Sequence, residues 1–335
     1  MVEENNIKIL ITGGSGFIGS SLVKKWLHEG HSIRILDNGM RGKLRRLAGL
    51  ENDIEYIQGD VRNFDDVNNA CNGMDAIAHL AYINGTEFFY TKPELILEIA
   101  LKGMINTIDA ALKNNIGQYW LMSSGEVYQT PEHIPTNESV SLKVPDPLNP
   151  RYSYGGGKII SELYALNYGL TNFDKVVVVR PHNVYGPDMG WEHVVPQFIL
   201  RANDLTNDHQ TGLLPFKIQG DGLHTRAFCF IDDFVAGAAL AFEKGGHREI
   251  YHVGTTEEVS IAQVAQKIAS SMGREARLIR GDEPAGQTLR RCPDISKVSS
   301  LGYRPKTNLD AGLVSTIDRY LQNIELRSTN TFAAS

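Results

Sequence analysis

The residues of this chain best suited to chemistry are a tyrosine and a lysine four positions apart, Tyr154 and Lys158. They fall in the stretch 153–168, whose periodicity predicts a helix, so both side chains should lie on one helix face. A free phenol has a pKa of about 10, and a cation about 4 Å away lowers it by roughly three units at an effective dielectric of 20. The pair therefore predicts a tyrosine general base that, with a further positive charge nearby, works near neutral pH.

A glycine-rich segment near the N-terminus predicts a dinucleotide site. Gly13, Gly16 and Gly19 follow the apolar run 7–11 and open the amphipathic stretch 17–29. They therefore occupy a strand-to-helix turn, where a pyrophosphate can approach the backbone and the helix N-terminus.

Asp37 ends the next apolar run, about 20 residues after the glycines. Its carboxylate should accept hydrogen bonds from the adenosine ribose and repel a 2′-phosphate, which predicts NAD rather than NADP. Arg34 and Arg41 lie nearby in the sequence and keep NADP open. Asp60, after the third strand, is a candidate contact to the adenine or a helix-capping residue.

The segments that must position these residues alternate between short apolar runs and helical stretches. The run 175–180 contains four consecutive valines, which is typical of a strand buried on both faces. The alternation predicts an α/β fold, a Rossmann doubly wound parallel sheet with a second, smaller substrate-binding lobe. Strands are predicted at 7–11, 33–36, 54–57, 76–80, 119–122 and 175–180, and helices at 17–29, 93–113 and 153–168.

After Pro181 the pattern breaks into loops rich in Pro, Gly and Asn, including the polar stretch 203–212. Helical periodicity returns at 232–244 and 260–272. We expect an NAD-binding Rossmann domain over 1–181, with return segments near 228–253. A substrate-binding lobe should follow over 182–325, and a flexible tail over 326–335.

The composition narrows the class of protein. Acidic residues number 39 against 33 basic ones, which argues against a nucleic-acid partner. The three scattered cysteines and the histidine spacing suit neither a disulfide framework nor a metal site, and predict a reducing compartment. The polar N-terminus indicates no signal peptide, and the longest apolar run, 234–242, is shorter than the about 20 residues that span a bilayer. We expect a cytoplasmic protein without a membrane partner.

Together these motifs resemble the extended short-chain dehydrogenase/reductases, the NAD-dependent nucleotide-sugar epimerase/dehydratase family. The resemblance covers 5–325 and is closest to the UDP-glucuronate decarboxylases. The matching segments are T-G-G-S-G-F-I-G at 12–19, Asp37-Asn38, Gly59-Asp60-Val61-Arg62, His79-Leu80-Ala81, S-S-G-E-V-Y at 123–128, Y-G-G-G-K at 154–158 and R-P-H-N-V-Y-G-P at 180–187.

The resemblance implies a role for each matching residue. Tyr154 would take the proton from the C4 hydroxyl of a nucleotide-linked sugar as hydride passes to NAD⁺, and Ser124 would hydrogen-bond the oxygen. Asn183 and Arg226 would hold the substrate diphosphate. Besides the residues discussed above, the implied contacts to NAD are Phe17, Ile18, Asn38, Val61, Leu80, Ala81 and Pro181.

The resulting 4-keto sugar can be decarboxylated, reduced again or dehydrated. Glu126 lies two positions after Ser124, on the same side of a segment expected to be extended. The family's dehydratases pair this Glu with a preceding Asp, whereas this chain has Gly125, so dehydration lacks its acid. A small residue before Glu instead resembles the decarboxylases, in which Arg291 would meet the sugar carboxylate.

Decarboxylation of a UDP-uronic acid is therefore the expected reaction, with Glu126 also in the catalytic group. The decarboxylase resemblance extends to P-R at 150–151, G-P-x-M at 186–189 and T-R-A-F at 225–228. Two features depart from it: Ala100 stands where the family usually has Asn, and 203–212 is an insertion. Epimerisation at C4 stays open, because it needs only Tyr154, Lys158 and Ser124, and dehydration or simple reduction follows it.

A non-catalytic NAD-binding regulator is the alternative from another class, since a fold alone does not imply activity. The intact tyrosine, lysine and serine argue against it. A homodimer is also expected, because the helices at 93–113 and 153–168 are apolar around much of their surface and the family resemblance points the same way.

Overall fold

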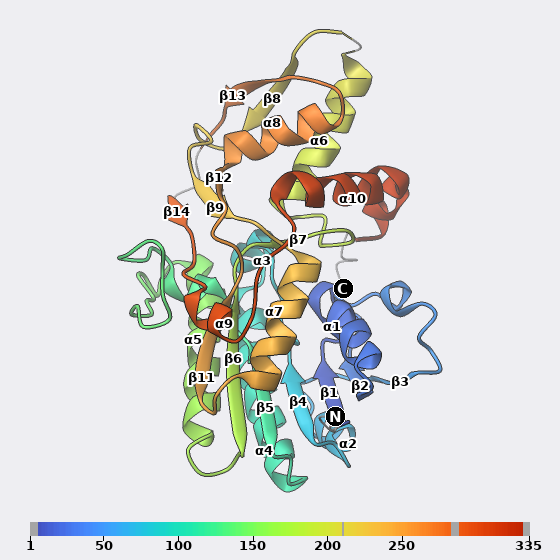
Figure 1. Ribbon diagram of the computed structural model, residues 1–335, viewed down its shortest axis with the longest axis vertical. Coiled ribbons are helices and arrows are strands. Elements are labelled where there is room, and N and C mark those ends of the chain that lie inside the picture. Colours follow the sequence, from blue (N-terminus) through green and yellow to red (C-terminus); the bar gives the residue numbers. More distant parts are fainter. Residues whose placement is uncertain (1–5, 210, 283–287, 331–335) are drawn as a thin grey trace.

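A seven-stranded parallel sheet forms the centre of the protein (Figure 1). The computed structural model describes residues 6–209, 211–282 and 288–330. The strand order is β11-β6-β5-β4-β1-β2-β3, with every neighbouring pair parallel, which confirms the predicted doubly wound sheet. The strands are β1 (Lys8–Thr12), β2 (Ser32–Asp37), β3 (Ile54–Gln58), β4 (Ala76–His79), β5 (Gln118–Met122), β6 (Lys175–Pro181) and β11 (Glu249–Val253).

Helices cover both faces of this sheet because its strands alternate apolar side chains between two cores. On β5, Trp120 points to one face, where its ring stacks on Phe242 with centroids 5.3 Å apart, and Tyr119 points to the other. The first face is covered by α1 (Phe17–His28) and α7 (Ile231–Lys244). The second is covered by α2 (Phe64–Cys71), α4 (Pro93–Lys113) and α5 (Ser153–Tyr168), with α3 (Thr86–Thr91) leading into α4.

A smaller lobe stands beyond the carboxyl ends of the sheet strands (Figure 1). Three small sheets build it, and β8 pairs in parallel with β13, which lies some sixty positions further along the chain. The strands outside the main sheet are β7 (Val184–Tyr185), β8 (Leu214–Ile218), β9 (Thr225–Ala227), β10 (Cys229–Phe230), β12 (Glu258–Ser260), β13 (Ala276–Arg280) and β14 (Arg290–Arg291). Its helices are α6 (Val194–Asp208), α8 (Ile261–Ser271) and α10 (Leu309–Gln322), whereas the short α9 (Ser296–Ser300) lies beside β11 of the main sheet.

The prediction of loop structure from 203 onward was wrong up to Asp208, which is the last residue of α6. The reason is packing: Val195, Phe198, Ile199 and Ala202 are buried at helical spacing and carry the helix through its polar last turns. Polar composition alone did not distinguish a solvated helix end from a loop.

Segments late in the chain return to the main sheet, where β11 pairs with β6 and α7 covers β6. The described part of the expected tail lies in a 3-10 helix, Ile324–Asn330. Shorter 3-10 helices occur at Leu44–Leu47, Gly125–Tyr128 and Pro150–Tyr152. Among the described residues, no helix combines the length and hydrophobicity that crossing a membrane would require.

Candidate active site

A large cavity of about 1080 Å³ lies between the carboxyl ends of the sheet strands and the smaller lobe. Parallel sheets bind ligands in this position, where the strand order reverses between β1 and β4. Every residue predicted to bind cofactor or substrate lines this cavity: Gly13, Gly16, Phe17, Ile18, Gly19, Asp37, Asn38, Asp60, Val61, Leu80, Ala81, Ser124, Glu126, Tyr154, Lys158, Pro181, Asn183, Arg226 and Arg291.

The turn between β1 and α1 has the shape that a bound pyrophosphate requires. Gly13 has a φ of 74°, and a Cβ placed on Gly19 would lie 2.3 Å from the Gly13 carbonyl oxygen. Glycine is therefore needed at both positions. Gly16 is the N-cap of α1 and makes no side-chain cap, so the N–H groups of the first helical turn face the cavity and suit a phosphate.

Asp37 lies at the end of β2 in the wall of the same cavity, 7 % exposed. Its carboxylate accepts hydrogen bonds from the backbone N–H groups of Ser15 (3.0 Å) and Gly39 (2.9 Å). Both cations that kept NADP open are ion-paired: Arg34 pairs with Glu55, and Arg41, which also lines the cavity, pairs with Glu192. Asp37 thus places a carboxylate in this part of the cavity, which favours NAD.

Asp60 is held by its own neighbours at the edge of the cavity. It accepts from Arg62 (2.8 Å) and from Asn38 (3.0 Å), and the Arg62 guanidinium lowers the pKa of Asp60 to about 2. The cap of α2 is Asn63, so the alternative role of Asp60 as a capping residue was wrong.

Tyr154 and Lys158 lie buried on α5, as the spacing predicts. The Lys158 ammonium, however, donates to the Met122 carbonyl oxygen (2.8 Å) and lies 5.9 Å from the centroid of the Tyr154 ring. Burial lowers the pKa of Lys158 to about 7 and raises the pKa of Tyr154, although the Ser124 hydroxyl acts to lower it. The expected lowering is therefore not supplied by the protein alone, because the ammonium is directed at a carbonyl rather than at the phenol.

The Tyr154 ring is packed between two aromatic side chains. Phe89 stacks on it with centroids 5.0 Å apart, and Tyr82 meets it edge-on at 5.1 Å. Tyr82 also covers Lys158, whose ammonium lies 3.8 Å from the Tyr82 centroid. This contact favours the charged form of the lysine.

Sequence reasoning missed Tyr82, which is made possible by two small residues on facing helices. A Cβ placed on Gly157 would lie 2.2 Å from the Tyr82 hydroxyl oxygen and 2.9 Å from the Cβ of Ala100. The Tyr82 hydroxyl and the Ala100 methyl group therefore both lie against Gly157, in space that a side chain at 157 would fill. The pairing of Ala100 with Gly157 was the available signal.

Ser124 and Glu126 do not share an extended segment as predicted, because Gly125–Tyr128 forms a 3-10 helix. Ser124 is its N-cap and its hydroxyl accepts from the Glu126 N–H (3.1 Å). A serine that can cap the following turn favours this geometry over a continued strand. Both side chains still reach the cavity.

Glu126 lies in the cavity near three arginines, Arg151, Arg226 and Arg291. Arg291 forms a two-point ion pair with it (2.8 Å for Nη2 to Oε2) and also donates to Thr288. Although burial of Glu126 acts to raise its pKa, the charges of Arg291, Arg151 and Arg226 lower it. Arg291, predicted to be available for a substrate carboxylate, is thus already paired, yet the group keeps an excess of positive charge.

A buried ion pair supports the strand ends from behind. Arg180 on β6 donates to both carboxylate oxygens of Glu162 on α5 (2.9 and 2.5 Å), and each side chain is only 2 % exposed. Ser123 donates to the same carboxylate. The pair therefore fixes α5, which carries Tyr154, to the strands that carry Ser124.

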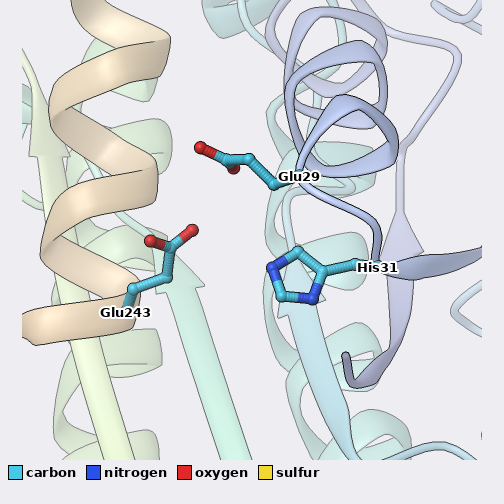
Figure 2. Close-up of side chains that lie close together, drawn as sticks. All are labelled: Glu29, His31 and Glu243. Carbon is cyan, nitrogen blue, oxygen red and sulfur yellow. The ribbon is translucent and has the colours of Figure 1, made fainter. Parts of the chain in front are cut away.

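Glu29, His31 and Glu243 form a group of potential metal ligands away from the cavity (Figure 2). Both carboxylates already have partners within the chain: Lys25 pairs with Glu29, and the Trp26 indole donates to Glu243. His31 Nδ1 accepts the Ile7 N–H, which places the ring proton on Nε2, the atom that faces the carboxylates. A protonated nitrogen cannot coordinate a metal, so we assign none here.

Fold and cavity together are those of a nucleotide-cofactor-binding protein with a smaller lobe above a Rossmann sheet. The chain belongs to the NAD dependent epimerase/dehydratase family, whose model matches residues 9–254. It is 31 % identical to UDP-glucuronic acid decarboxylase 1 of Xenopus tropicalis, over 98 % of this chain and 76 % of that one. It is 30 % identical to a dTDP-glucose 4,6-dehydratase of an Actinoplanes species, over 95 % and 98 %.

The fold also matches a solved dTDP-glucose 4,6-dehydratase, DesIV of Streptomyces venezuelae, whose structure contains NAD. The TM-score is 0.83 at 27 % identity, covering 95 % of this chain and 98 % of the other. NAD is therefore the cofactor of the family to which this chain belongs, and the glycine turn and Asp37 described above fit it.

Proposed function

We propose that this protein decarboxylates a nucleotide-linked uronic acid through a 4-keto intermediate. The observation that carries the proposal is the cluster of Arg151, Arg226 and Arg291 around Glu126, in the same cavity as Tyr154. Three cations against one carboxylate suit a substrate with an acidic group on its sugar besides its diphosphate. Gly125 removes the acid that a dehydratase would need.

Each of the following cavity residues has a separate role in the proposed reaction. Tyr154 takes the proton of the C4 hydroxyl, Ser124 hydrogen-bonds the developing carbonyl oxygen, and Lys158 supplies positive charge beneath them. NAD⁺, when bound, accepts the C4 hydride and returns it. Arg291 exchanges Glu126 for the substrate carboxylate, while Arg226 and Asn183 hold the diphosphate. Because the carboxylate is β to the new C4 carbonyl, its loss as carbon dioxide needs little further help.

One observation favours C4 epimerisation as the second candidate. The Glu126–Arg291 pair is closed in this structure, and an uncharged sugar would leave it so. Epimerisation asks only for Tyr154, Lys158 and Ser124, all of which line the cavity.

Changing Arg291 to alanine separates these candidates. We expect UDP-glucuronate to bind about 10- to 150-fold more weakly, since a hydrogen bond to a charged group contributes about 1.5–3 kcal/mol. Binding of UDP-glucose should change much less. Titration calorimetry with both nucleotides measures the difference, and mass spectrometry of the products identifies the reaction.

Arg290→Ala is the matched control, because this neighbouring arginine is largely exposed and pairs with Glu258 outside the cavity. It should bind both nucleotides like the wild type. If Arg291→Ala and Glu126→Gln both leave turnover unchanged, neither residue serves the chemistry, and epimerisation becomes the better assignment.

We also propose that the protein is a homodimer through α4 and α5. These helices pack side by side and expose apolar residues on one surface, namely Leu97, Leu101, Ile105, Ile160 and Leu163, each at least 39 % exposed. Burying such a patch against a second copy removes apolar area from water.

A charge in this patch should produce monomers. We expect Leu101→Glu to shift the sedimentation coefficient from that of a dimer to that of a monomer at micromolar concentration. Val314→Glu places the same charge at an exposed apolar residue of α10 and should leave the assembly intact. A monomeric wild-type protein would refute the proposal.

A further inference from the structure

His182, the residue that follows β6, places its imidazole in the wall of the cavity beside Gly125. The side chain is buried, with 5 % of the residue exposed. A Cβ placed on Gly125 would lie 2.6 Å from His182 Cε1 and 2.7 Å from Nδ1. The ring therefore occupies the space that a side chain at 125 would need, next to Ser124.

The ring of His182 is also unusual in its hydrogen bonding, since its buried Nε2 has no partner among the described residues. The neighbouring His252, whose centroid lies 4.7 Å away, is bonded at both nitrogens, to the Tyr128 hydroxyl and the Asp294 carbonyl oxygen. Buried polar atoms are nearly always paired, so an unpaired one requires an explanation, such as a catalytic role. Packing alone would be served as well by an apolar ring.

The titratable groups closest to Ser124 are otherwise engaged. Glu126 is paired with Arg291, and the Lys158 ammonium donates to the Met122 carbonyl oxygen. Tyr154 is assigned to the C4 oxygen. Beside Gly125, the buried Nε2 of His182 is thus a ring nitrogen that no described residue holds.

We propose that His182 is a further catalytic residue, which delivers the proton to C5 of the sugar after the carboxylate has left. This inference rests on the proposed decarboxylation. In that step the C5–C6 bond breaks, carbon dioxide departs, and the bond's electron pair forms an enolate across C4 and C5. The imidazolium of His182 then gives its proton to C5 and restores the C4 carbonyl.

This assignment balances the reaction. Loss of carbon dioxide from a carboxylate consumes one proton, and neither the C4 hydroxyl proton nor the returning hydride supplies it. His182 takes up that proton, which comes ultimately from solvent, once per turnover and passes it on. Its oxidation state and that of the enzyme are unchanged.

The surroundings of His182 make this proton uptake depend on the substrate. Burial, together with the charges of His252, Arg291 and Arg180, holds the pKa of His182 well below its ordinary value, so the ring is neutral before substrate binds. A substrate carboxylate paired with Arg291 brings a negative charge toward the ring and offsets those cations, which favours the imidazolium.

The test uses the full-length enzyme with NAD and UDP-glucuronate, in water and in deuterium oxide. For His182→Gln we expect product formation to fall about 10²-fold or more, as loss of a general acid does, while absorbance of reduced cofactor near 340 nm persists. The wild type should place one deuterium stereospecifically at C5, and the residual product of the variant should be labelled on both faces.

Two further variants keep the test decisive if the substitution His182→Gln perturbs the fold. His182→Phe keeps a ring and should behave like His182→Gln, and added imidazole should restore product formation in His182→Ala. Stereospecific labelling at an unchanged rate in His182→Gln would overturn the role of His182, as would loss of cofactor reduction in all three variants. Wild-type enzyme that releases no carbon dioxide from UDP-glucuronate would instead refute the proposed function.

Discussion

Replacing Tyr154 by phenylalanine is expected to lower kcat by about 10²–10⁴-fold, the usual effect of losing a general base. The ring would still stack on Phe89 and meet Tyr82 edge-on, because those contacts involve only its carbon atoms. NAD affinity should therefore stay within a few-fold of the wild-type value. Single-turnover reduction of the cofactor, followed in absorbance, and titration of NAD by fluorescence measure the two quantities.

Tyr164→Phe provides a control on the same helix. Its hydroxyl donates to the Tyr168 hydroxyl (3.2 Å) outside the cavity, so its loss should not affect turnover. Full activity in Tyr154→Phe would contradict the mechanism proposed here. Equal losses in both variants would assign the effect to the helix rather than to the base.

The second large effect concerns stability. Glu162→Leu should reduce the free energy of unfolding by about 3–5 kcal/mol, since it leaves the buried Arg180 guanidinium without its carboxylate. The midpoint of urea unfolding, followed by tryptophan fluorescence, reports the change because Trp120 lies on β5, next to β6, which carries Arg180.

Two variants test the reason for this loss. Glu162→Leu combined with Arg180→Met removes both charges and should recover much of the stability, as apolar replacements of whole buried pairs do. Lys102→Met breaks the exposed pair with Glu98 and should leave stability nearly unchanged. A double variant no more stable than Glu162→Leu would show that packing around the pair, rather than the unpaired charge, causes the loss.

The main sheet could be predicted because its signals are local. The valines of β6 and the glycine turn after β1 each specify their structure within a few residues, and both predictions were confirmed. The smaller lobe could not, because β8 finds its partner in β13 far along the chain and the end of α6 depends on what its apolar face packs against. Propensity gives no information on either.

The same distinction between local and long-range information applies to the candidate site. Residues in motifs, such as Asp37 and Lys158, could be placed at the cavity from sequence, whereas their partners could not. That Arg291 pairs with Glu126, and that His182 fills the space beside Gly125, depends on distant segments meeting. The small residues at 100, 125 and 157 indicate, in the sequence, positions against which side chains from distant segments can pack.

The aromatic packing around Tyr154 determines when the conformational entropy of its side chain is lost. With Phe89 against one face and the Tyr82 ring meeting it edge-on, Tyr154 has few rotamers left in the folded protein. Its side-chain freedom is lost once, when the chain folds, and is not lost again each time a substrate binds. The binding free energy of each new substrate is then available to orient the sugar, because the base is preorganised before the sugar arrives.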